Sequence, residues 1–592
     1  MGALTDSIND LRTNARQWEA FYHRGHCVVL APPGSGKTKL LTTRLAYDLF
    51  NHIPEPHGAA CITLTNAAAR QLQRRVETLG APQRSTLFIG TVHSFALRQV
   101  VLPFARLTGK AELLSLGIAS DKQERAAYVE AVAHVFGDPR YPSDYVEEVK
   151  ARRRSLDTAP VTPGNPYLAA ERRYRDNLRR QGLMDFDDVV EAAVDIVEHN
   201  PALRDVLMAR YPHLYIDEYQ DLHPGLDRLI RALCLGEAKA ELFAVGDPEQ
   251  ALYGWAGSNP DLLFDLASQP DVHSVRLEHN YRCGHEIIRV ANCIQRGHTM
   301  VGHRDGGDIT TTRCPGGFPD QCEHVVGVVR QAVASGAVLH EIAVLCSTNR
   351  ECKEVAKAMR DNGIPAFIRE DAYRLNRATS FVENCTSWIA AGREFSDARL
   401  GNLLRDWRRL LTPSWTPQHD GALVEVLLDY PTRPDTAASA LLADLFVLGL
   451  AGVFEQQAQA EEARALEQMK EHFADGGHHP LTVKDLAERV RRTNRVEVTT
   501  MTASKGLEFD IVLILGMDEK HVPHFKSAND QAKLNEDRRK FFVSITRARQ
   551  AVHIFYSGFV RWPSGRSATA GPSRFLLEAG LITSASSPSR LW

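Results

Sequence analysis

The stretch that decides the fold is "CVVLAPPGSGKTKLLTTR", residues 27–44. Its apolar start, Cys27 to Leu30, predicts a short buried strand. The Gly/Pro-rich segment that follows predicts a loop, and the remainder has the pattern of a helix. A strand, a glycine-rich loop and a helix in this order are the context of a phosphate-binding P-loop. The strict pattern has a glycine six residues before the lysine, where this chain has Ala31.

The remaining positions of this loop suit a nucleoside triphosphate. Gly34 and Gly36, on either side of Ser35, allow backbone N–H groups to approach phosphates. Lys37 supplies positive charge to the outer phosphates, and the Thr38 hydroxyl is a ligand type that Mg²⁺ uses. The loop predicts ATP and Mg²⁺ as cofactors, but P-loops occur in enzymes of many functions, so it does not identify the reaction.

A second motif, "HLYIDEYQD" at residues 213–221, supplies carboxylates. Apolar residues lead into Asp217 and Glu218, which indicates two acids at the carboxyl end of a strand. In a chain with a P-loop, Asp217 fits a Mg²⁺ ligand and Glu218 fits the base that orients the attacking water. Hydrolysis also needs positive charge on its transition state, and Arg282 and Arg547 are the candidates.

Composition describes a globular chain and leaves its partners open. The 592 residues are 24% charged and 44% hydrophobic, with a net charge of −3. No apolar run approaches the roughly 20 residues of a membrane helix, and the N-terminus has no signal pattern, so we expect a cytoplasmic protein with no membrane partner. Ten cysteines without a C-x-x-C pattern predict free thiols. The basic stretches 150–155 and 171–180 fit either a solvated helix face or a phosphate-contacting surface.

The order and spacing of at least seven blocks, from about residue 10 to about residue 575, resemble the UvrD/Rep/PcrA branch of superfamily 1 DNA helicases. The blocks are "TNARQWEAF", the P-loop, "CITLTNAAARQLQRRV", "IGTVHSFA", "YIDEYQD", "GDPEQALYGWAGS", "VTTMTASKGLEFDIVLILGM" and "NEDRRKFFVSITRARQAVHIFY". They are chemically unrelated, which makes their shared order specific. "MDFDDVV" at 184–190 also resembles the stretch that precedes the second motif in this family.

The resemblance assigns roles around the nucleotide. Gln17 would read the adenine edge, Arg44 and Tyr281 would sandwich the base, and Glu508 would touch the ribose. The catalytic set implied in this way is Lys37, Asp217, Glu218, Gln250, Arg282 and Arg547, with Thr38 and Asp217 on the metal, Lys505 in the phosphate network, and Gln250 and Arg547 at the γ-phosphate.

The resemblance also assigns residues to single-stranded or partly duplex DNA: Thr65, Asn66, Thr91, His93, Tyr253 and Trp255. Bases would stack on Tyr253 and Trp255, at roughly 1–3 kcal/mol per base. Because Gln250 lies in the same loop, that loop would connect hydrolysis to movement along the strand. Three positions depart from the family pattern, all on the DNA or coupling side: Leu64 replaces an aromatic residue, Ala256 an arginine and Thr502 a histidine.

Short apolar strands alternate with helical stretches and predict an α/β fold of open parallel sheets. The predicted strands are "CVVLA", "ACITLT", "TLFIG", "LYIDE" and "LFAVG" in the first part of the chain, and "IAVLC", "IVLILG" and "AVHIFY" later. The resemblance implies two RecA-like motor domains, each with a mainly helical insertion. We expect motor domain 1A at 1–95 and 205–275, insert 1B at 96–204, motor domain 2A at 276–385 and 490–575, a reduced insert 2B at 386–489, and a short tail at 576–592.

The predicted function is an ATP-dependent DNA translocase or helicase, moving 3′ to 5′ as the resemblance implies, in DNA repair or anti-phage defence. The compact insert 2B also resembles the helicase subunit of a Gabija-type defence system, which would act with a nuclease partner. A further alternative is an ATPase switch that nucleic acid stimulates and that unwinds little. Stacking and phosphate contacts do not distinguish DNA from RNA, so an RNA strand also stays open.

Overall fold

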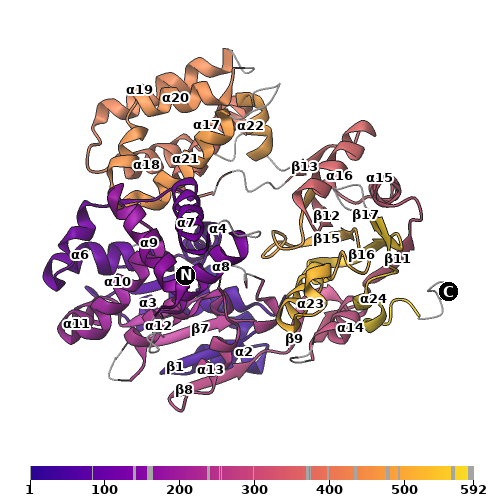
Figure 1. Ribbon diagram of the computed structural model, residues 1–592, viewed down its shortest axis with the longest axis horizontal. Coiled ribbons are helices and arrows are strands. Elements are labelled where there is room, and N and C mark those ends of the chain that lie inside the picture. Colours follow the sequence, from indigo (N-terminus) through magenta and orange to yellow (C-terminus); the bar gives the residue numbers. More distant parts are fainter. Residues whose placement is uncertain are drawn as a thin grey trace.

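The computed structural model contains two parallel β-sheets, each covered by helices on both faces (Figure 1). It describes residues 2–82, 84–137, 142–156, 164–236, 240–252, 254, 257–295, 297, 299–368, 373, 375–395, 399–432, 436–474, 481–490, 494–561 and 567–583. The predicted α/β class with two parallel sheets is confirmed.

The first sheet has six strands in the order β3-β2-β6-β7-β1-β8, all parallel. The strands are β1 (His26–Leu30), β2 (Ala59–Thr63), β3 (Phe88–Thr91), β6 (His213–Ile216), β7 (Glu241–Gly246) and β8 (Val272–Arg276). Alternate residues of β1 enter different cores: Cys27 and Val29 face one side of the sheet, Val28 and Leu30 the other. Burial on both faces explains why the central strands are continuous apolar runs.

Each face of this sheet has its own helices. One face packs against α1 (Gly2–Leu11), α2 (Ala15–Tyr22), α3 (Lys37–Asn51) and α4 (Asn66–Thr78). The other packs against α10 (Phe186–His199), α11 (Pro201–Arg210), α12 (Pro224–Cys234) and α13 (Asp261–Ala267). Helix α10 falls within the range 96–204 that we assigned to an insert, yet its apolar residues belong to the core of the first sheet.

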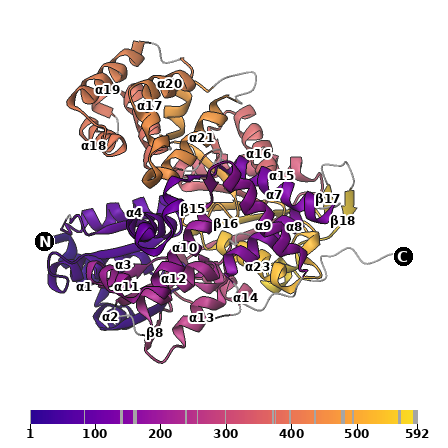
Figure 2. The same ribbon diagram turned by 60° about the vertical axis from the view of Figure 1, so that its left-hand side comes forward.

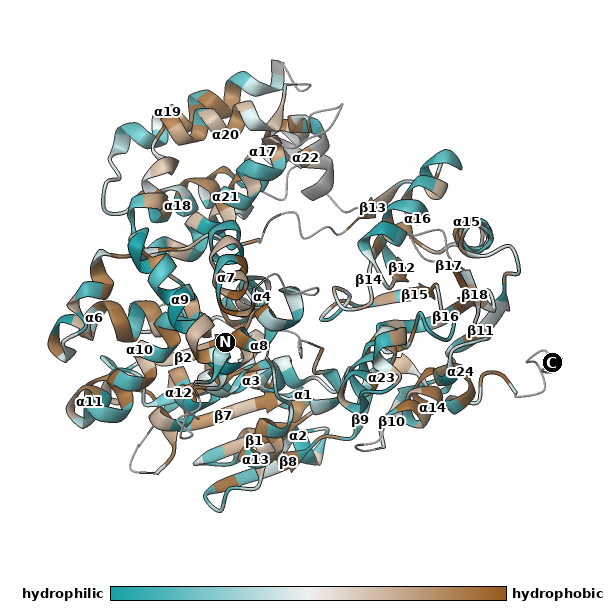
Figure 3. Cartoon of the chain, viewed as in Figure 1, coloured by the Kyte–Doolittle hydropathy of each residue, from teal (hydrophilic) through white to brown (hydrophobic). Residues whose placement is uncertain are grey.

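The second sheet repeats this design with the order β11-β16-β15-β12-β14-β13, again all parallel. Its strands are β11 (Asp308–Arg313), β12 (Ile342–Cys346), β13 (Ala366–Ile368), β14 (Val496–Thr500), β15 (Phe509–Ile514) and β16 (Ala548–Tyr556). Helices α14 (His285–Ile294), α23 (Gln531–Ile545) and α24 (Arg574–Glu578) cover one face, and α15 (Phe318–Ala334) and α16 (Asn349–Asp361) cover the other. In Figure 3 the ribbon of β15 is brown, while much of α23 is teal.

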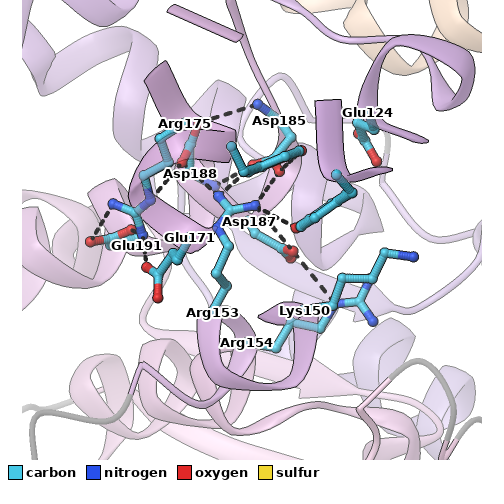
Figure 4. A network of polar contacts seen from close by, with 12 residues as sticks. Glu124, Lys150, Arg153, Arg154, Glu171, Arg175, Asp185, Asp187, Asp188 and Glu191 are labelled. Carbon is cyan, nitrogen blue, oxygen red and sulfur yellow. Dashed lines mark hydrogen bonds and ion pairs between the residues drawn. The ribbon is translucent and has the colours of Figure 1, made fainter. Parts of the chain in front are cut away.

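Three helices between β3 and β6 form a separate small core: α7 (Asp121–Phe136), α8 (Pro142–Ser155) and α9 (Pro166–Arg180). A buried arginine connects this core to the first sheet (Figure 4). Arg153, at the end of α8 and only 3% exposed, donates to Asp185 at 2.9 Å, to Asp188 at 2.6 Å and to the Tyr128 hydroxyl at 2.9 Å. Asp185 caps α10, so this network fixes the three-helix core to a helix of the first lobe.

The second helical unit comprises α17 (Arg377–Phe395), α18 (Leu400–Leu411), α19 (Pro417–Asp429), α20 (Ala438–Val447), α21 (Ala460–Ala474) and α22 (Val483–Val490). It has its own apolar core. Figures 1 and 2 both show it, in orange, above the indigo and purple part of the chain. Its helix α21 contacts the first lobe and the three-helix core: Arg98 donates to Glu462 at 2.9 Å, and Arg464 pairs with Glu124 at 2.9 Å.

None of the helices in the described ranges combines the length and the apolar character needed to cross a membrane.

The Arg153 network gives a stability prediction. Replacing Arg153 by alanine leaves Asp185 buried without a cation, while Asp188 keeps Arg179 at 3.1 Å, so the free energy of unfolding should fall by about 3–5 kcal/mol. Urea unfolding measures the change. Exposed Arg172 on α9 is the matched control, and its alanine variant should stay within about 0.5 kcal/mol of the parent chain. Equal stability of the two variants would contradict a structural role for the network.

Candidate functional site

A cleft of about 500 Å³ lies where the two sheets face each other. Its lining combines the P-loop and the end of β6 from the first lobe with segments around residues 282, 505 and 547 from the second. Eight cationic side chains line it against four carboxylates. This excess of positive charge suits a polyanionic ligand, so the charge balance of the cleft agrees with a triphosphate site.

The P-loop connects β1 to α3 and is held by a neighbouring segment. Gly34 and Gly36 have positive φ values of 68° and 82°, where glycine is favoured. A Cβ atom on Gly34 would lie 2.7 Å from the Cβ of Arg282 and 2.9 Å from the Asn280 amide, so only glycine permits this approach. The Asn280 side chain donates to Pro33 O at 2.6 Å, and the Tyr281 N–H donates to Gly34 O at 2.9 Å. The first lobe's loop is thereby shaped by the strand that leads into the second lobe.

The departure at Ala31 has a simple geometric reason. The Ala31 N–H donates to Gly246 O at 2.9 Å and continues the pairing of β1 with β7. Its φ is not positive, so the position does not require glycine. Ser35 is also explained by the loop, since its hydroxyl donates to Pro32 O at 2.7 Å.

The two predicted carboxylates directly follow β6. Lys37 Nζ lies 2.9 Å from Glu218 Oε1. Glu218 has a φ of +56°, a strained conformation for a non-glycine residue that is typical of functional sites. Burial and the Glu218 charge raise the pKa of Asp217. Burial also acts to raise the pKa of Glu218, but Lys37 and Lys505 outweigh it and lower that pKa to about 2, so Glu218 is ionised at neutral pH.

The second lobe contributes three cations near these acids. Arg282 Nε donates to Glu508 at 2.9 Å, and Lys505 donates to Asp221 at 2.7 Å. Arg547 is 2% exposed, and no ion pair to it occurs among the described residues. Burial and the neighbouring Arg282 cation lower the pKa of Arg547 to about 9. An anionic ligand beside Arg547 would offset the cost of burying its charge and favour the protonated guanidinium.

Gln250 joins the two lobes across the cleft. Its side-chain Oε1 accepts from Arg547 at 3.2 Å, and its Nε2 donates to Asp247 at 2.8 Å. Its main-chain oxygen accepts from Lys505 at 2.7 Å. One residue in the loop after β7 therefore contacts two cations of the other lobe.

The four residues predicted to contact the base or the ribose lie in different places. Tyr281 and Glu508 line the cleft. Gln17 lies behind the P-loop, where its amide donates to Ser35 O at 2.7 Å. Arg44 as a base-stacking residue is wrong: it is 1% exposed and outside the cleft, paired with Asp48 and donating to Phe21 O at 2.7 Å.

Helix geometry explains the error at Arg44. Seven residues after Lys37 is two turns of α3, about 10 Å along its axis, which leads away from the phosphates. Lys39, two residues after Lys37, does line the cleft. We did not predict Lys39. Its position in the first turn of α3, next to the P-loop, could have indicated that it lies near the nucleotide. Arg75, Asp221, Arg304 and Arg549 also line the cleft without having been predicted.

Four of the predicted DNA contacts lie at or just after the ends of the neighbouring strands β2 and β3. Thr65 caps α4 by accepting from the Ala68 N–H at 3.2 Å, and Asn66 is the first residue of that helix. Thr91 donates to Glu461 of α21 at 2.7 Å. The His93 ring lies 5.6 Å from Phe186 and 6.3 Å from His223. Tyr253, Trp255 and Ala256 lie outside the described residues.

The basic stretches are largely neutralised within the protein. Besides buried Arg153, Arg173 donates to Glu130 at 2.6 Å, Arg175 contacts Glu171 at 3.0 Å, and Arg179 contacts Asp188 at 3.1 Å. Several of these arginines therefore hold the three-helix core together. Neither of the two interpretations of the basic stretches, a solvated helix face or a phosphate-contacting surface, included this role.

Comparison with known proteins identifies the arrangement. Residues 13–271 match the profile of the UvrD/REP helicase N-terminal domain, and residues 454–558 match that of the UvrD-like helicase C-terminal domain. The chain belongs to the UvrD-like helicase family. The predicted resemblance, and with it the prediction of an ATP-hydrolysing helicase, is confirmed.

Two relatives show that the similarity extends along the whole chain. The ATP-dependent DNA helicase PcrA of Staphylococcus epidermidis is 24% identical over 660 residues, spanning 98% of this chain and 87% of the relative. The protein of the same name from Staphylococcus aureus is 23% identical over 666 residues, with the same coverage. The helicase-family match therefore includes both lobes and both helical units.

The correction at Arg44 can be tested against Lys39. Arg44→Ala should lower the free energy of unfolding by about 3–5 kcal/mol, because it removes the buried cation that pairs with Asp48 and leaves that acid with half-exposed Arg24. Nucleotide affinity of the folded protein should stay nearly unchanged. Lys39→Ala should show the reverse: unchanged stability and weaker nucleotide binding. Urea unfolding and titration with a fluorescent ATP analogue measure the two effects. Loss of nucleotide affinity in folded Arg44→Ala alone would restore the original assignment.

Proposed function

We propose that this chain is an ATP-driven translocase acting on single-stranded or partly duplex DNA, with 3′-to-5′ movement. The observation that carries the proposal is the Gln250 junction, where one residue contacts both Arg547 and Lys505 of the opposite lobe. Gln250 also lies in the loop that holds the predicted base-stacking residues. The relatives' printed name, ATP-dependent DNA helicase, supports the same substrate. In a bacterial cell, such as those of the two relatives, DNA as the track would place the enzyme in the cytoplasm.

The ion pairs of the cleft suggest how nucleotide binding prepares hydrolysis. Lys37 pairs with Glu218 in the present arrangement. The outer phosphates of ATP would compete for the Lys37 ammonium and release the Glu218 carboxylate, which would then accept a proton from the attacking water. Arg282 and Arg547 would stabilise negative charge in the transition state, where arginines are worth roughly 10³ to 10⁵ in rate.

The oxygen donors of the cleft fit a magnesium ion. The Thr38 hydroxyl and the Asp217 carboxylate both line it, and Mg²⁺ is commonly held by one or two protein oxygens together with substrate phosphates. The raised pKa of Asp217 is consistent with a carboxylate that needs a nearby cation to ionise. When bound, the ion supplies charge neutralisation at the phosphates.

We propose the domain division 1A, 1B, 2A and 2B at the predicted boundaries, with one refinement. The separate core of α7, α8 and α9 makes these helices the body of insert 1B, whereas α10 packs with the motor sheet.

Contacts to the DNA phosphates should provide most of the affinity for the DNA strand, so DNA binding should weaken as the salt concentration increases.

The alternative is a switch subunit that serves a nuclease partner in anti-phage defence and unwinds little. The substitutions at Leu64, Ala256 and Thr502 favour it, because they fall on the DNA or coupling side and leave the phosphate residues intact. ATP hydrolysis that single strands stimulate, without displacement of a forked duplex, would support this alternative; displacement would support the translocating helicase.

Glu218→Gln tests the assigned reaction. Because the amide cannot accept a proton, ATP turnover with single-stranded DNA should fall by about 10²- to 10⁴-fold, while ATP and DNA still bind. Coupled phosphate release and strand-binding anisotropy measure these effects. Asp176→Asn, an acid-to-amide change away from the cleft, serves as control. Parent turnover that is identical with and without oligonucleotide, or normal turnover in Glu218→Gln, would contradict the proposal.

The contact between Glu461 and Thr91 gives a second prediction. A strand that uses the Thr91 hydroxyl has to displace the Glu461 carboxylate, so Glu461→Ala should bind single-stranded DNA more tightly, by about two- to tenfold. Glu471→Ala, an exposed residue of the same helix, makes the same change in net charge and should have little effect. Equal gains in both variants would mean that only overall charge matters and that Thr91 is not at the interface.

A further inference from the structure

A cysteine, an aspartate and a histidine meet on the second lobe, outside the nucleotide cleft. Cys314 follows β11, the edge strand of the second sheet, and Asp320 and His324 lie on α15. A sulfur, a carboxylate oxygen and a ring nitrogen of these residues all lie within 4.8 Å of one another. None of the three lines the cleft.

The backbone around this group holds the side chains toward each other. The Cys314 N–H donates to Tyr556 O of β16 at 2.7 Å, and the Gly317 N–H donates to Cys314 O at 3.1 Å. A Cβ on Gly316 would lie 2.8 Å from the Asp320 Cβ, and Gly317 has a φ of +86°. Both glycines are therefore needed for the turn to bring the thiol under the first turn of α15.

The two helical ligands are already oriented. Asp320 Oδ2 accepts from the Gly316 N–H at 2.9 Å, and Oδ1 lies 3.2 Å from His324 Nδ1. The same ring nitrogen lies 2.9 Å from the main-chain oxygen of Asp320, a contact that a bound ion would replace. Residues four apart lie on the same face of a helix. For a nitrogen and an oxygen bound to a tetrahedral zinc, the expected separation is about 3.3 Å. The Asp320–His324 edge thus already has the required length.

We propose that Cys314, Asp320 and His324 form a Zn²⁺ site. Thiolate, imidazole and carboxylate are the ligands that zinc uses in proteins. The side chains of Asp320 and His324 are 25% and 45% exposed, whereas Cys314 is buried, so one side of the ion would face solvent and bind water as the fourth ligand. Among the described residues the thiol makes one hydrogen-bond contact, to Thr312 O at 4.0 Å. The three ligand atoms, now within 4.8 Å of one another, would have to move closer together to share one ion.

Zinc at this position would join the edge strand β11 to α15. The competing explanation is that Asp320 merely satisfies the Gly316 N–H and that His324 is an ordinary partner four residues later. Burial in the apolar core beside Cys322 and Val325 gives Cys314 a packing role in this explanation as well, so a measurement of metal binding has to separate the two. Zinc binding also predicts a property that an ordinary helix start lacks, because an ion that binds only the folded chain raises its melting temperature.

The full chain, stripped of metal with a chelator and kept reduced with a phosphine, is titrated with Co²⁺ as a spectroscopic substitute. The expected result is one ion per chain, with visible bands of tetrahedral cobalt and a near-ultraviolet thiolate-to-cobalt band, all removed by Zn²⁺. Cys314→Ser and His324→Ala should lose these bands, and Asp320→Asn should bind about tenfold or more weakly. Cys293→Ser, which removes an exposed thiol elsewhere, should match the parent.

Thermal unfolding with and without Zn²⁺ separates a site from adventitious binding. The melting temperature of the parent and of Cys293→Ser should rise with Zn²⁺, and that of Cys314→Ser should not. Absence of the thiolate band in the parent, or identical cobalt binding and zinc stabilisation in Cys314→Ser, would overturn the site. If Cys314→Ser fails to fold, His324→Ala, which changes an exposed side chain, gives the same comparison.

Discussion

The buried guanidinium of Arg547 is the constraint around which the two lobes are organised. A cation without a carboxylate partner among the described residues is costly to bury, and the lowered pKa of Arg547 reflects this cost. The amide of Gln250 meets it with a neutral oxygen, which orients the cation without neutralising it. A triphosphate would supply negative charge beside this cation, so the lowered pKa of Arg547 and a preference for a bound anion have the same origin. Both lobes have to be present for this balance to exist.

The sequence predicted β-strands best where both faces of the strand are buried. The interior strands, such as β1, β7, β12 and β15, are apolar runs because both faces are covered, and all of them were predicted. The edge strands β8, "VHSVR", and β11, "DITTTR", were not, because one side of an edge strand meets solvent and its residues alternate or are polar. The P-loop glycines, Lys37 and the Asp217–Glu218 pair were found because phosphate chemistry restricts the residue types. Arg44 was misplaced because spacing along a helix does not reveal how far the axis has moved from the site.

Charge proved harder to interpret than hydrophobicity. The basic stretch around Arg153 was compatible with solvent or with a phosphate backbone, and neither alternative contained the buried carboxylates of Asp185 and Asp188 that it meets. The partners are 32 and 35 residues away, so local composition cannot identify them. The contact between Thr91 and Glu461 is more remote still, at a separation of 370 residues. Only the folded chain shows that an acid of the second helical unit occupies a position assigned to DNA.

The left-handed backbone conformation at Glu218 affects which substitutions evolution would favour at this position. Glycine would relieve a conformational penalty of about 1–3 kcal/mol at that position, so selection for robustness alone favours loss of the carboxylate. Natural or laboratory lineages released from the need to hydrolyse nucleotide should therefore drift toward glycine or asparagine here sooner than at neighbouring Asp217, whose φ is not positive. The identity of this one residue becomes a marker of whether a descendant still works as a motor.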